Sequence, residues 1–385
     1  MRLRVLLAIH GPADDRTAVY RTVSTHAQYL RDQGHRVNLV TADDLRWLSP
    51  RLDPICLPPV LALKGVSHYD VAVFHSFLGC AFHACHPVLD PGRRTATVTS
   101  FHGLEPLYFH ALADEAEREG RSLSARYRLL HGRVMPRLLR ASCRASNAVF
   151  CLNSTEAQYL VAGAWAPADR VHVLPNGVEA EAFVGRVPRP AVRELLFVGQ
   201  WLPAKGVRYL VQAFADLAAC EDVRLTCVGT GAPADVVTAA FPEAVRGRVQ
   251  VVPSAGRDQI YQALQAADLF VFPTLSEGFS KALLEAMAAA LPVVTTAVGA
   301  AADILRDGHN GLLVPPADAA AIASAVTRYV RDPELAARHG AAARVTAEAY
   351  RLEVVSRQWA DRLYAVVDRH ARDARGVEVR RDVVL

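Results

Sequence analysis

The sequence predicts an α/β protein with two doubly wound domains of similar size. The chain has 385 residues, which is more than a single hydrophobic core usually supports. Apolar runs of four to six residues alternate with longer amphipathic stretches, a pattern typical of parallel strands buried beneath helices. The pattern stops at 187–191, where two prolines can continue neither a helix nor a central strand, and then starts again. We therefore expect domains at 1–187 and 188–385.

The expected elements follow this alternation through both halves of the chain. In the first half a helix is expected at 19–33, ended by Gly34, and the strands are expected at 4–9, 36–41, 70–75, 95–100, 148–153 and 171–174. In the second half the expected strands are 195–198, 224–228, 249–252, 269–272, 292–295 and 312–314, and the expected helices include 207–217, 259–267 and 281–290. Two such domains are expected to face a deep cleft, and a ligand is expected in that cleft, between the carboxyl ends of their strands.

Composition excludes several classes of protein. The net charge of +4 is too small to indicate a nucleic-acid partner. The seven cysteines are odd in number and contain no CxxC pair, so neither a disulfide framework nor a zinc site is expected. The apolar start at 1–9 is too short for a signal peptide, and no apolar run reaches the length of about 20 residues that a membrane span needs. These observations predict a soluble, cytoplasmic protein.

One basic segment leaves a peripheral membrane contact open. Residues 121–144 contain seven arginines and no acid, several of them at helical spacing, and a basic amphipathic helix can lie on an anionic membrane at its inner face. Pro136 is expected to interrupt this helix, and few large apolar side chains are expected beside the arginines. A solvated helix face, or a face that meets an anionic acceptor, is therefore favoured over a membrane contact.

The most informative segment joins an expected strand to an expected helix at 272–287. Ser280 suits the N-cap of that helix, whose free N–H groups and positive dipole end can bind an anion. Lys281 is unfavourable at a helix start unless it meets an anion or solvent. Glu277 and Glu285 are separated by seven residues, so a carboxylate stands near each end of this loop. Two such carboxylates can accept hydrogen bonds from the two sugars of a nucleotide sugar, on either side of its diphosphate.

This segment resembles the E-x7-E motif of retaining GT-B glycosyltransferases of family 4. The resemblance extends over nearly the whole chain, through the segments 34–37, 176–179, 197–199 with 205–206, 268–273 and 310–315. It implies a GT-B fold, with an acceptor domain at 1–187, a donor domain at 188–385, and a last helix near 358–375 that packs on the N-terminal domain. It also implies transfer of a sugar from a UDP-, GDP- or dTDP-sugar to a hydroxyl acceptor, with retention of configuration and with neither metal nor cofactor.

The resemblance also implies roles for individual residues. Glu285 is expected to bind the ribose, Glu277 and His102 to meet the transferred sugar, and Lys205 to neutralise the departing diphosphate. The remaining expected donor contacts are Gly11, Gly199, Gln200, Gly278, Phe279, Ser280 and Lys281.

Two departures from the family pattern qualify the expected activity. Gln200 stands where the family carries an arginine, so that one phosphate cation is missing unless Arg208 or Arg257 replaces it. Thr17 and Ala18 stand where the family carries two glycines.

Three other functions remain open on the sequence. The segment 229–234 fits G-x-G-x-x-A, the fingerprint of a dinucleotide-dependent oxidoreductase, but it contains a proline and lies on the wrong strand. A GT-B phosphorylase that uses sugar phosphates would share the cleft and its cations. A non-catalytic nucleotide-sugar binding protein would fit the two departures.

Overall fold

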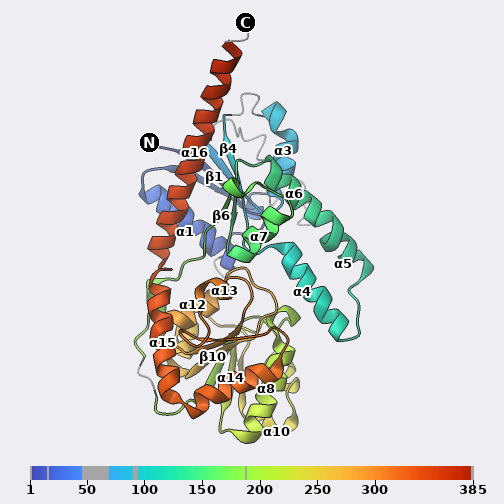
Figure 1. The fold of residues 1–385 in the computed structure, drawn as a ribbon, viewed down its shortest axis with the longest axis vertical. Coiled ribbons are helices and arrows are strands. Elements are labelled where there is room, and N and C mark those ends of the chain that lie inside the picture. Colours follow the sequence, from blue (N-terminus) through green and yellow to red (C-terminus); the bar gives the residue numbers. More distant parts are fainter. Residues whose placement is uncertain (1, 15–16, 46–68, 90–93, 187–188, 383–385) are drawn as a thin grey trace. The chain divides into compact units, whose positions relative to one another are not determined.

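The computed structural model describes residues 2–14, 17–45, 69–89, 94–186 and 189–382. Contacts divide the chain into two compact units, one formed by 1–106, 124–175 and 353–385, the other by 107–123 and 176–352. Each unit contains a six-stranded sheet whose paired strands are all parallel. This confirms the predicted fold class (Figure 1). The expected boundary at 187–188 falls outside the described residues.

The first unit is organised around a sheet with the order β2-β1-β3-β4-β5-β6. Its strands are β1 (Arg4–Ala8), β2 (Arg36–Val40), β3 (Val71–His75), β4 (Ala96–Ser100), β5 (Ala148–Cys151) and β6 (Val171–Val173). Strands β3, β4 and β5 are buried along their whole length, because helices cover both faces of the sheet. Continuous apolar runs, rather than alternating ones, are the sequence signal of that arrangement.

Two hydrophobic clusters cover the two faces of this sheet. Helix α1 (Ala18–Asp32) and helix α16 (Leu352–Asp382) pack on one face, where Leu30, Trp359 and Leu363 are buried together with alternate residues of β1. Helix α3 (Leu78–Leu89) packs on the other face through Phe82. The helix that ends the chain therefore completes the core of the unit that the N-terminus begins (Figure 1).

Thr17 has a structural reason to replace a glycine. Its hydroxyl accepts a hydrogen bond from Tyr20 N at 3.4 Å and caps helix α1. A hydroxyl side chain at this position satisfies an N–H group that glycine would leave to water. The helix ends before Gly34, whose φ of +85° favours a residue without a side chain.

The basic segment differs from its expectation. Helix α4 (Glu105–Arg118) is followed by α5 (Ala125–Leu129), a π-helical turn at Leu130–Val134, and α6 (Met135–Ala145). Pro136 does not interrupt the helical run, because it occupies the start of α6 and the wider turn before it accommodates the missing N–H. Helix α7 (Ser154–Ala162) precedes β6.

The second unit repeats the parallel design with the sheet order β12-β11-β10-β7-β8-β9. Its strands are β7 (Glu194–Val198), β8 (Arg224–Val228), β9 (Val249–Val252), β10 (Leu269–Phe272), β11 (Val293–Thr296) and β12 (Leu312–Val314). Its helices are α8 (Val207–Cys220), α9 (Ala234–Ala239), α10 (Glu243–Arg246), α11 (Arg257–Ala266), α12 (Lys281–Ala288), α13 (Ala301–Ile304), α14 (Ala319–Arg331) and α15 (Pro333–Glu348). All six strands, and the three helices expected at 207–217, 259–267 and 281–290, lie within three residues of their expected bounds.

Candidate functional site

The loop between β10 and α12 leads into a capped helix N-terminus of the kind that can bind an anion. Ser280 caps α12, and its hydroxyl accepts a hydrogen bond from Leu283 N at 3.2 Å. Glu285 follows on the second turn and is only 7% exposed. The N–H groups and the positive end of the helix dipole meet at this loop. The predicted N-cap is therefore confirmed.

Two glycines let neighbouring backbone approach this loop closely. A Cβ at Gly206 would lie 1.8 Å from the carbonyl oxygen of Pro273, and a Cβ at Gly299 would lie 1.9 Å from that of Glu277. Both glycines also have left-handed φ angles, of +67° and +55°. The loop is therefore clamped by the segments that follow β7 and β11, and its backbone is fixed before any ligand binds.

Hydrogen bonds complete this clamp. Leu275 N donates to the carbonyl of Ala204 at 2.8 Å, and Ala300 N donates to that of Gly278 at 3.0 Å. On the helix side, the amide of the buried Asn176 donates to the carbonyl of Phe279 at 3.3 Å. The segment 176–179, which the sequence marked as part of the family pattern, therefore supports the same loop.

Lys205 and Glu277 form a direct ion pair. The Lys205 Nζ donates to Glu277 Oε2, and both side chains are about four-fifths buried. The ammonium also lies 5.5 Å from the centre of the Phe272 ring. The structure thus brings together two residues that the sequence placed 72 positions apart.

A second carboxylate, Glu179, holds two further cations. Lys281 Nζ lies 3.5 Å from Glu179 Oε1, and an Arg257 guanidinium nitrogen lies 3.3 Å from the same oxygen. The position of Lys281 is unfavourable for the helix dipole, and Glu179 compensates it. Sequence reasoning did not assign Glu179 to the site, although the family segment 176–179 contained it.

Tyr261 is a further member of this cluster that the sequence did not indicate. It lies on α11 and is 8% exposed, and its hydroxyl has no hydrogen-bond partner among the described residues. Burial raises the pKa of Tyr261, and the nearby carboxylates of Glu285 and Glu179 raise it further. Its phenol therefore stays protonated and remains a hydrogen-bond donor beside the two acids.

Gln200 stands where the family carries an arginine, and Arg257 is a cation of this cluster that can replace it. Gln200 is exposed, whereas Arg257 shares Glu179 with Lys281. Arg208 instead lies 3.8 Å from the carboxylate of Glu115, on α4, and 3.8 Å from that of Glu119, just after α4. Of the two arginines considered from the sequence, Arg257 is the one beside Lys281.

Gly199 and Gly11, the two remaining glycines predicted to contact the donor, differ in whether their surroundings require a glycine. Gly199 follows β7, has a φ of +157° and donates to the Val228 carbonyl at 2.9 Å. A Cβ at Gly11 would meet nothing within 4 Å. The sterics of the described structure therefore leave room for a side chain at Gly11.

His102 lies in the first unit, after β4. Its ring stacks on that of His75, with centroids 4.6 Å apart and planes within 14°. His75 is fully buried, and burial together with the neighbouring His102 holds its pKa well below the ordinary value. A neutral His75 therefore supports one face of the His102 ring, while Gly103, with a φ of +128°, turns the chain after it.

The G-x-G-x-x-A segment follows β8, and no atom of the described residues crowds its two glycines. Gly229 and Gly231 have left-handed φ angles, but a Cβ at either would meet nothing within 4 Å. The helix that follows, α9, has six residues and no side-chain cap. The helix that follows this segment is therefore shorter than α12 and lacks the side-chain cap that Ser280 gives to α12.

Two observations concern other kinds of site. Among the residues that the structure describes, no group of three or more histidines, cysteines or acids could hold a metal ion. No helix within those same ranges combines the length and the apolar character that a membrane crossing requires.

Comparison with protein-family models now defines the class of protein. Residues 19–182 match the model described as Glycosyltransferase Family 4, and residues 192–332 match the model described as Glycosyl transferases group 1. Together with two parallel-sheet units of six strands each, these matches show that the chain belongs to the GT-B glycosyltransferases.

Individual relatives agree with this assignment. The chain is 34% identical over 226 residues to a D-inositol 3-phosphate glycosyltransferase of Xylanimonas cellulosilytica, covering 54% of each chain. It is 34% identical over 195 residues to a phosphatidyl-myo-inositol mannosyltransferase of Mycobacterium leprae, covering 48% of this chain and 51% of that one. The chain thus spans about half the length of these curated relatives.

Solved structures share the fold at low sequence identity. Sucrose-phosphate synthase from Thermosynechococcus elongatus matches with a TM-score of 0.76 at 20% identity, covering 94% of this chain and 100% of that one. Anabaena Alr3699/HepE, solved in complex with UDP-glucose, matches with a TM-score of 0.65 at 18% identity over 94% and 100% of the two chains. At such identities the likeness concerns the fold.

Proposed function

We propose that the protein is a retaining glycosyltransferase that moves a sugar from a nucleoside-diphosphate sugar to a hydroxyl acceptor. The observation that carries this proposal is the clamped loop before α12, with Lys205 and Lys281 beside it and the buried Glu285 behind it. Two cations and a helix start suit a diphosphate. A buried carboxylate next to them suits the hydroxyls of a ribose.

The diphosphate and its two sugars would occupy this loop in a fixed order. Glu285 would accept hydrogen bonds from the ribose, while the N–H groups near Phe279, Ser280 and Lys281 would hold the diphosphate. Glu277 would meet the hydroxyls of the transferred sugar, at the other end of the loop. Gly199, Gln200, Gly278 and Gly11 remain proposed donor contacts, with Gly11 the least constrained by its surroundings.

In the proposed reaction, the bond between the anomeric carbon and the diphosphate oxygen breaks first. The electron pair leaves with the nucleoside diphosphate, whose added negative charge Lys205 and the helix start would stabilise. The acceptor hydroxyl then attacks from the face that the diphosphate left and loses its proton to the leaving phosphate, so configuration is retained. The cations of the chain would take the part that a metal plays elsewhere, and His102 would contact the donor sugar.

Before the donor binds, the Glu277 and Glu179 carboxylates would neutralise the cations of the donor site. Each now holds cations that a diphosphate would also attract: Lys205 for Glu277, and Lys281 with Arg257 for Glu179. Charges that are already paired cost less to keep in a partly buried site. Donor binding would then exchange a carboxylate for a phosphate on the same cations.

A panel of nucleotides tests the proposal and identifies the base. UDP is the first candidate because the fold neighbour Alr3699/HepE was solved with UDP and UDP-glucose. GDP, ADP and dTDP, with their sugars, complete the panel. Binding of one nucleotide should raise the melting temperature by mass action. Release of that nucleotide when its sugar donor is supplied with glycan, lipid-linked or small-molecule hydroxyl acceptors would establish transfer.

Two alternatives predict different outcomes of the same experiment. A phosphorylase would release a sugar phosphate only when inorganic phosphate is present. A binding protein would be stabilised by the nucleotide sugar and yet would neither hydrolyse nor transfer it. Retention is tested separately, by the anomeric configuration of the product in its NMR spectrum.

We also propose a peripheral contact between the α5–α6 segment and an anionic membrane. Four large apolar side chains on this segment are exposed, namely Leu129, Leu130, Val134 and Leu138. The same segment, 125–145, contributes six arginines and no acid. Apolar anchors among basic residues are typical of helices that lie in a membrane interface. This is more apolar surface than the sequence led us to expect.

This contact would place the enzyme in the cytoplasm, at the inner face of the membrane. The described free thiols, such as the buried Cys143 and Cys227, fit a reducing compartment. Sedimentation with phosphatidylglycerol vesicles tests the contact. Leu129→Ser with Leu138→Ser should reduce binding severalfold, whereas Val345→Ser, an exposed apolar residue of α15, should not.

A further inference from the structure

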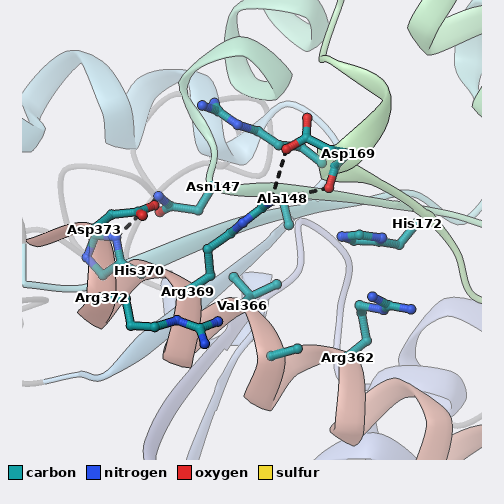
Figure 2. Close-up of a pocket in the computed structure, with 12 residues that line it drawn as sticks. Asn147, Ala148, Asp169, His172, Arg362, Val366, Arg369, His370, Arg372 and Asp373 are labelled. Atoms are coloured by element: carbon teal, nitrogen blue, oxygen red, sulfur yellow. Dashed lines mark hydrogen bonds and ion pairs between the residues drawn. The ribbon is translucent and has the colours of Figure 1, made fainter. Parts of the chain in front are cut away.

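A cavity of about 460 Å³ opens beside α16 in the first unit, and none of the residues that line it is assigned to the donor site. Its walls come from the start of β5, the turn before β6, the strand β6 itself and one face of α16 (Figure 2). These are the amino ends of β5 and β6, whereas His102 follows the carboxyl end of β4 in the same parallel sheet. Cavities of a few hundred Å³ are large enough for a small-molecule ligand.

Positive charge dominates the lining of this cavity. Arg362, Arg369 and Arg372 face it from α16, and Arg170 faces it from the turn before β6. Only two acids, Asp169 and Asp373, lie among the lining residues. Spacings of seven and three residues place the three arginines of α16 on one face of the helix.

Most of this charge has no internal partner. Arg369 is paired with the Asp169 carboxylate at 3.0 Å and also donates to the Asp169 carbonyl at 3.3 Å. In the described part of the chain, no ion pair is found for Arg170, Arg362 or Arg372. Like charges gathered around one cavity repel each other, so an anion placed among them would be bound and would also relieve that repulsion.

His172 reports the resulting positive field. It lies on β6 opposite Arg362 (Figure 2). Burial, together with the guanidinium groups of Arg362 and Arg369, lowers the pKa of His172 to about 4, against a smaller opposite effect of Asp169. The imidazole is therefore neutral at pH 7, and its N–H can donate to a ligand without adding charge.

The opposite end of the cavity offers a fixed amide. The side-chain Oδ1 of Asn147 accepts from Thr97 N at 2.8 Å and from Thr97 Oγ1 at 3.2 Å. These bonds turn the Asn147 NH₂ group toward α16, where it lies 3.3 Å from His370 Nδ1. Figure 2 shows Arg362 with His172 on one side, Arg372 with His370 on the other, and Arg369 between them.

We propose that this cavity binds a small molecule that bears phosphate groups, with at least two negative charges. Arginine is suited to this task because its planar fork donates two parallel hydrogen bonds to a phosphate. Separate cationic ends fit a diphosphate or a ligand with two phosphoryl groups better than a single anion. The site is independent of the proposed donor site, since the two share no residue.

The test uses inorganic pyrophosphate and the full chain, followed through the imidazole resonances of His172 in ¹H–¹⁵N spectra. The spectrum of His172→Gln assigns these resonances. Pyrophosphate should shift them saturably and raise the pKa of His172, because an anion offsets the two arginines. Arg362→Gln with Arg372→Gln should weaken this binding at least tenfold. Arg357→Gln, an exposed arginine of α16 that does not line the cavity, is the matched control and should leave it unchanged.

Further measurements distinguish a lipid headgroup from a free metabolite as the ligand, and the cavity site from the proposed donor site. If phosphatidylglycerol vesicles compete with pyrophosphate for the cavity, the natural ligand is a lipid headgroup. If they do not compete, the ligand is a free metabolite. Either result supports a phosphate site in this cavity. Glu285→Ala should still bind pyrophosphate here even if it no longer binds nucleotides. The arginines are exposed, so the double variant should keep its melting temperature. Unchanged binding in that variant, or equal weakening in Arg357→Gln, would overturn the proposal.

Discussion

Lys281 and Glu179 lie 3.5 Å apart in the second unit, where they bring the start of α12 and the turn after β6 together. Arg257 contacts the same carboxylate at 3.3 Å. A single acid thus neutralises two cations at a helix start that is otherwise ready for an anion.

Glu179→Gln should bind nucleoside diphosphate more tightly than the wild type does. The change frees Lys281 and Arg257 from their shared carboxylate, and the diphosphate then meets two uncompensated cations. The unliganded protein should lose about 2 kcal/mol of stability, because hydrogen bonds to charged groups contribute roughly 1.5–3 kcal/mol. Calorimetric titration and thermal melting measure the two effects. Weaker nucleotide binding would instead mean that Glu179 itself contacts the ligand.

Glu285→Ala should lose nucleotide affinity by at least tenfold. Glu285 is a buried carboxylate behind the loop, and no other acid takes its place on that turn of α12. Glu334→Ala, an exposed acid in the first turn of α15, is the matched control. Both variants are measured by titration with the nucleotide that the panel identifies. Near-normal affinity in Glu285→Ala would remove the central assignment.

Lys205→Gln should lower kcat more than it raises KM. The ammonium is proposed to meet charge that develops on the leaving diphosphate, and removal of one such group costs about 10²–10³ in rate. Lys205→Arg keeps the charge and should recover part of kcat. Steady-state kinetics with varied donor distinguish the two constants. A rise in KM alone would assign Lys205 to ground-state binding.

Gly299→Ala should destabilise the protein much more than Gly229→Ala. Both glycines have left-handed φ angles, so both variants carry backbone strain of about 1 kcal/mol. Only at Gly299 would the new Cβ also meet a carbonyl, that of Glu277. Denaturant unfolding measures the difference. Equal losses would show that the loop before α12 yields readily and is not clamped.

Stability should fall as the pH drops below about 6.5, the ordinary pKa of histidine. Burial and His102 depress the pKa of His75 in the folded protein, so the unfolded chain binds the extra proton first and unfolding is favoured in acid. The contribution of neutral His75 to the free energy of unfolding is fully present above the pKa that His75 has in the unfolded chain. It is lost as the pH falls toward the lower pKa that His75 has in the folded protein. His75→Phe should flatten this dependence of the melting temperature, whereas His110→Phe, at an exposed histidine, should not.

Much of the fold was readable because its signals are local. Strands such as β3 and β10 appear in the sequence as unbroken apolar runs, since helices cover both faces of a parallel sheet. The N-cap role of Ser280 followed from its place between a strand and a series of good helix formers. The prediction that Pro136 interrupts the basic helical segment was wrong. A π-helical turn precedes Pro136, and no residue type in the sequence indicates such a turn.

The sequence by itself determined the class of the protein and the loop at 272–287, because the order of strands, turns and helix caps is written along the chain. Only the tertiary structure decided which charges meet. The partners of Lys205, Lys281 and Arg257 lie far away in sequence, and Tyr261 joins them from α11, the helix that also carries Arg257. Long-range pairs depend on how helices pack on a sheet, and residue spacing does not encode that packing. The same reason hides the arginine-lined cavity, whose two walls are separated by nearly half of the chain.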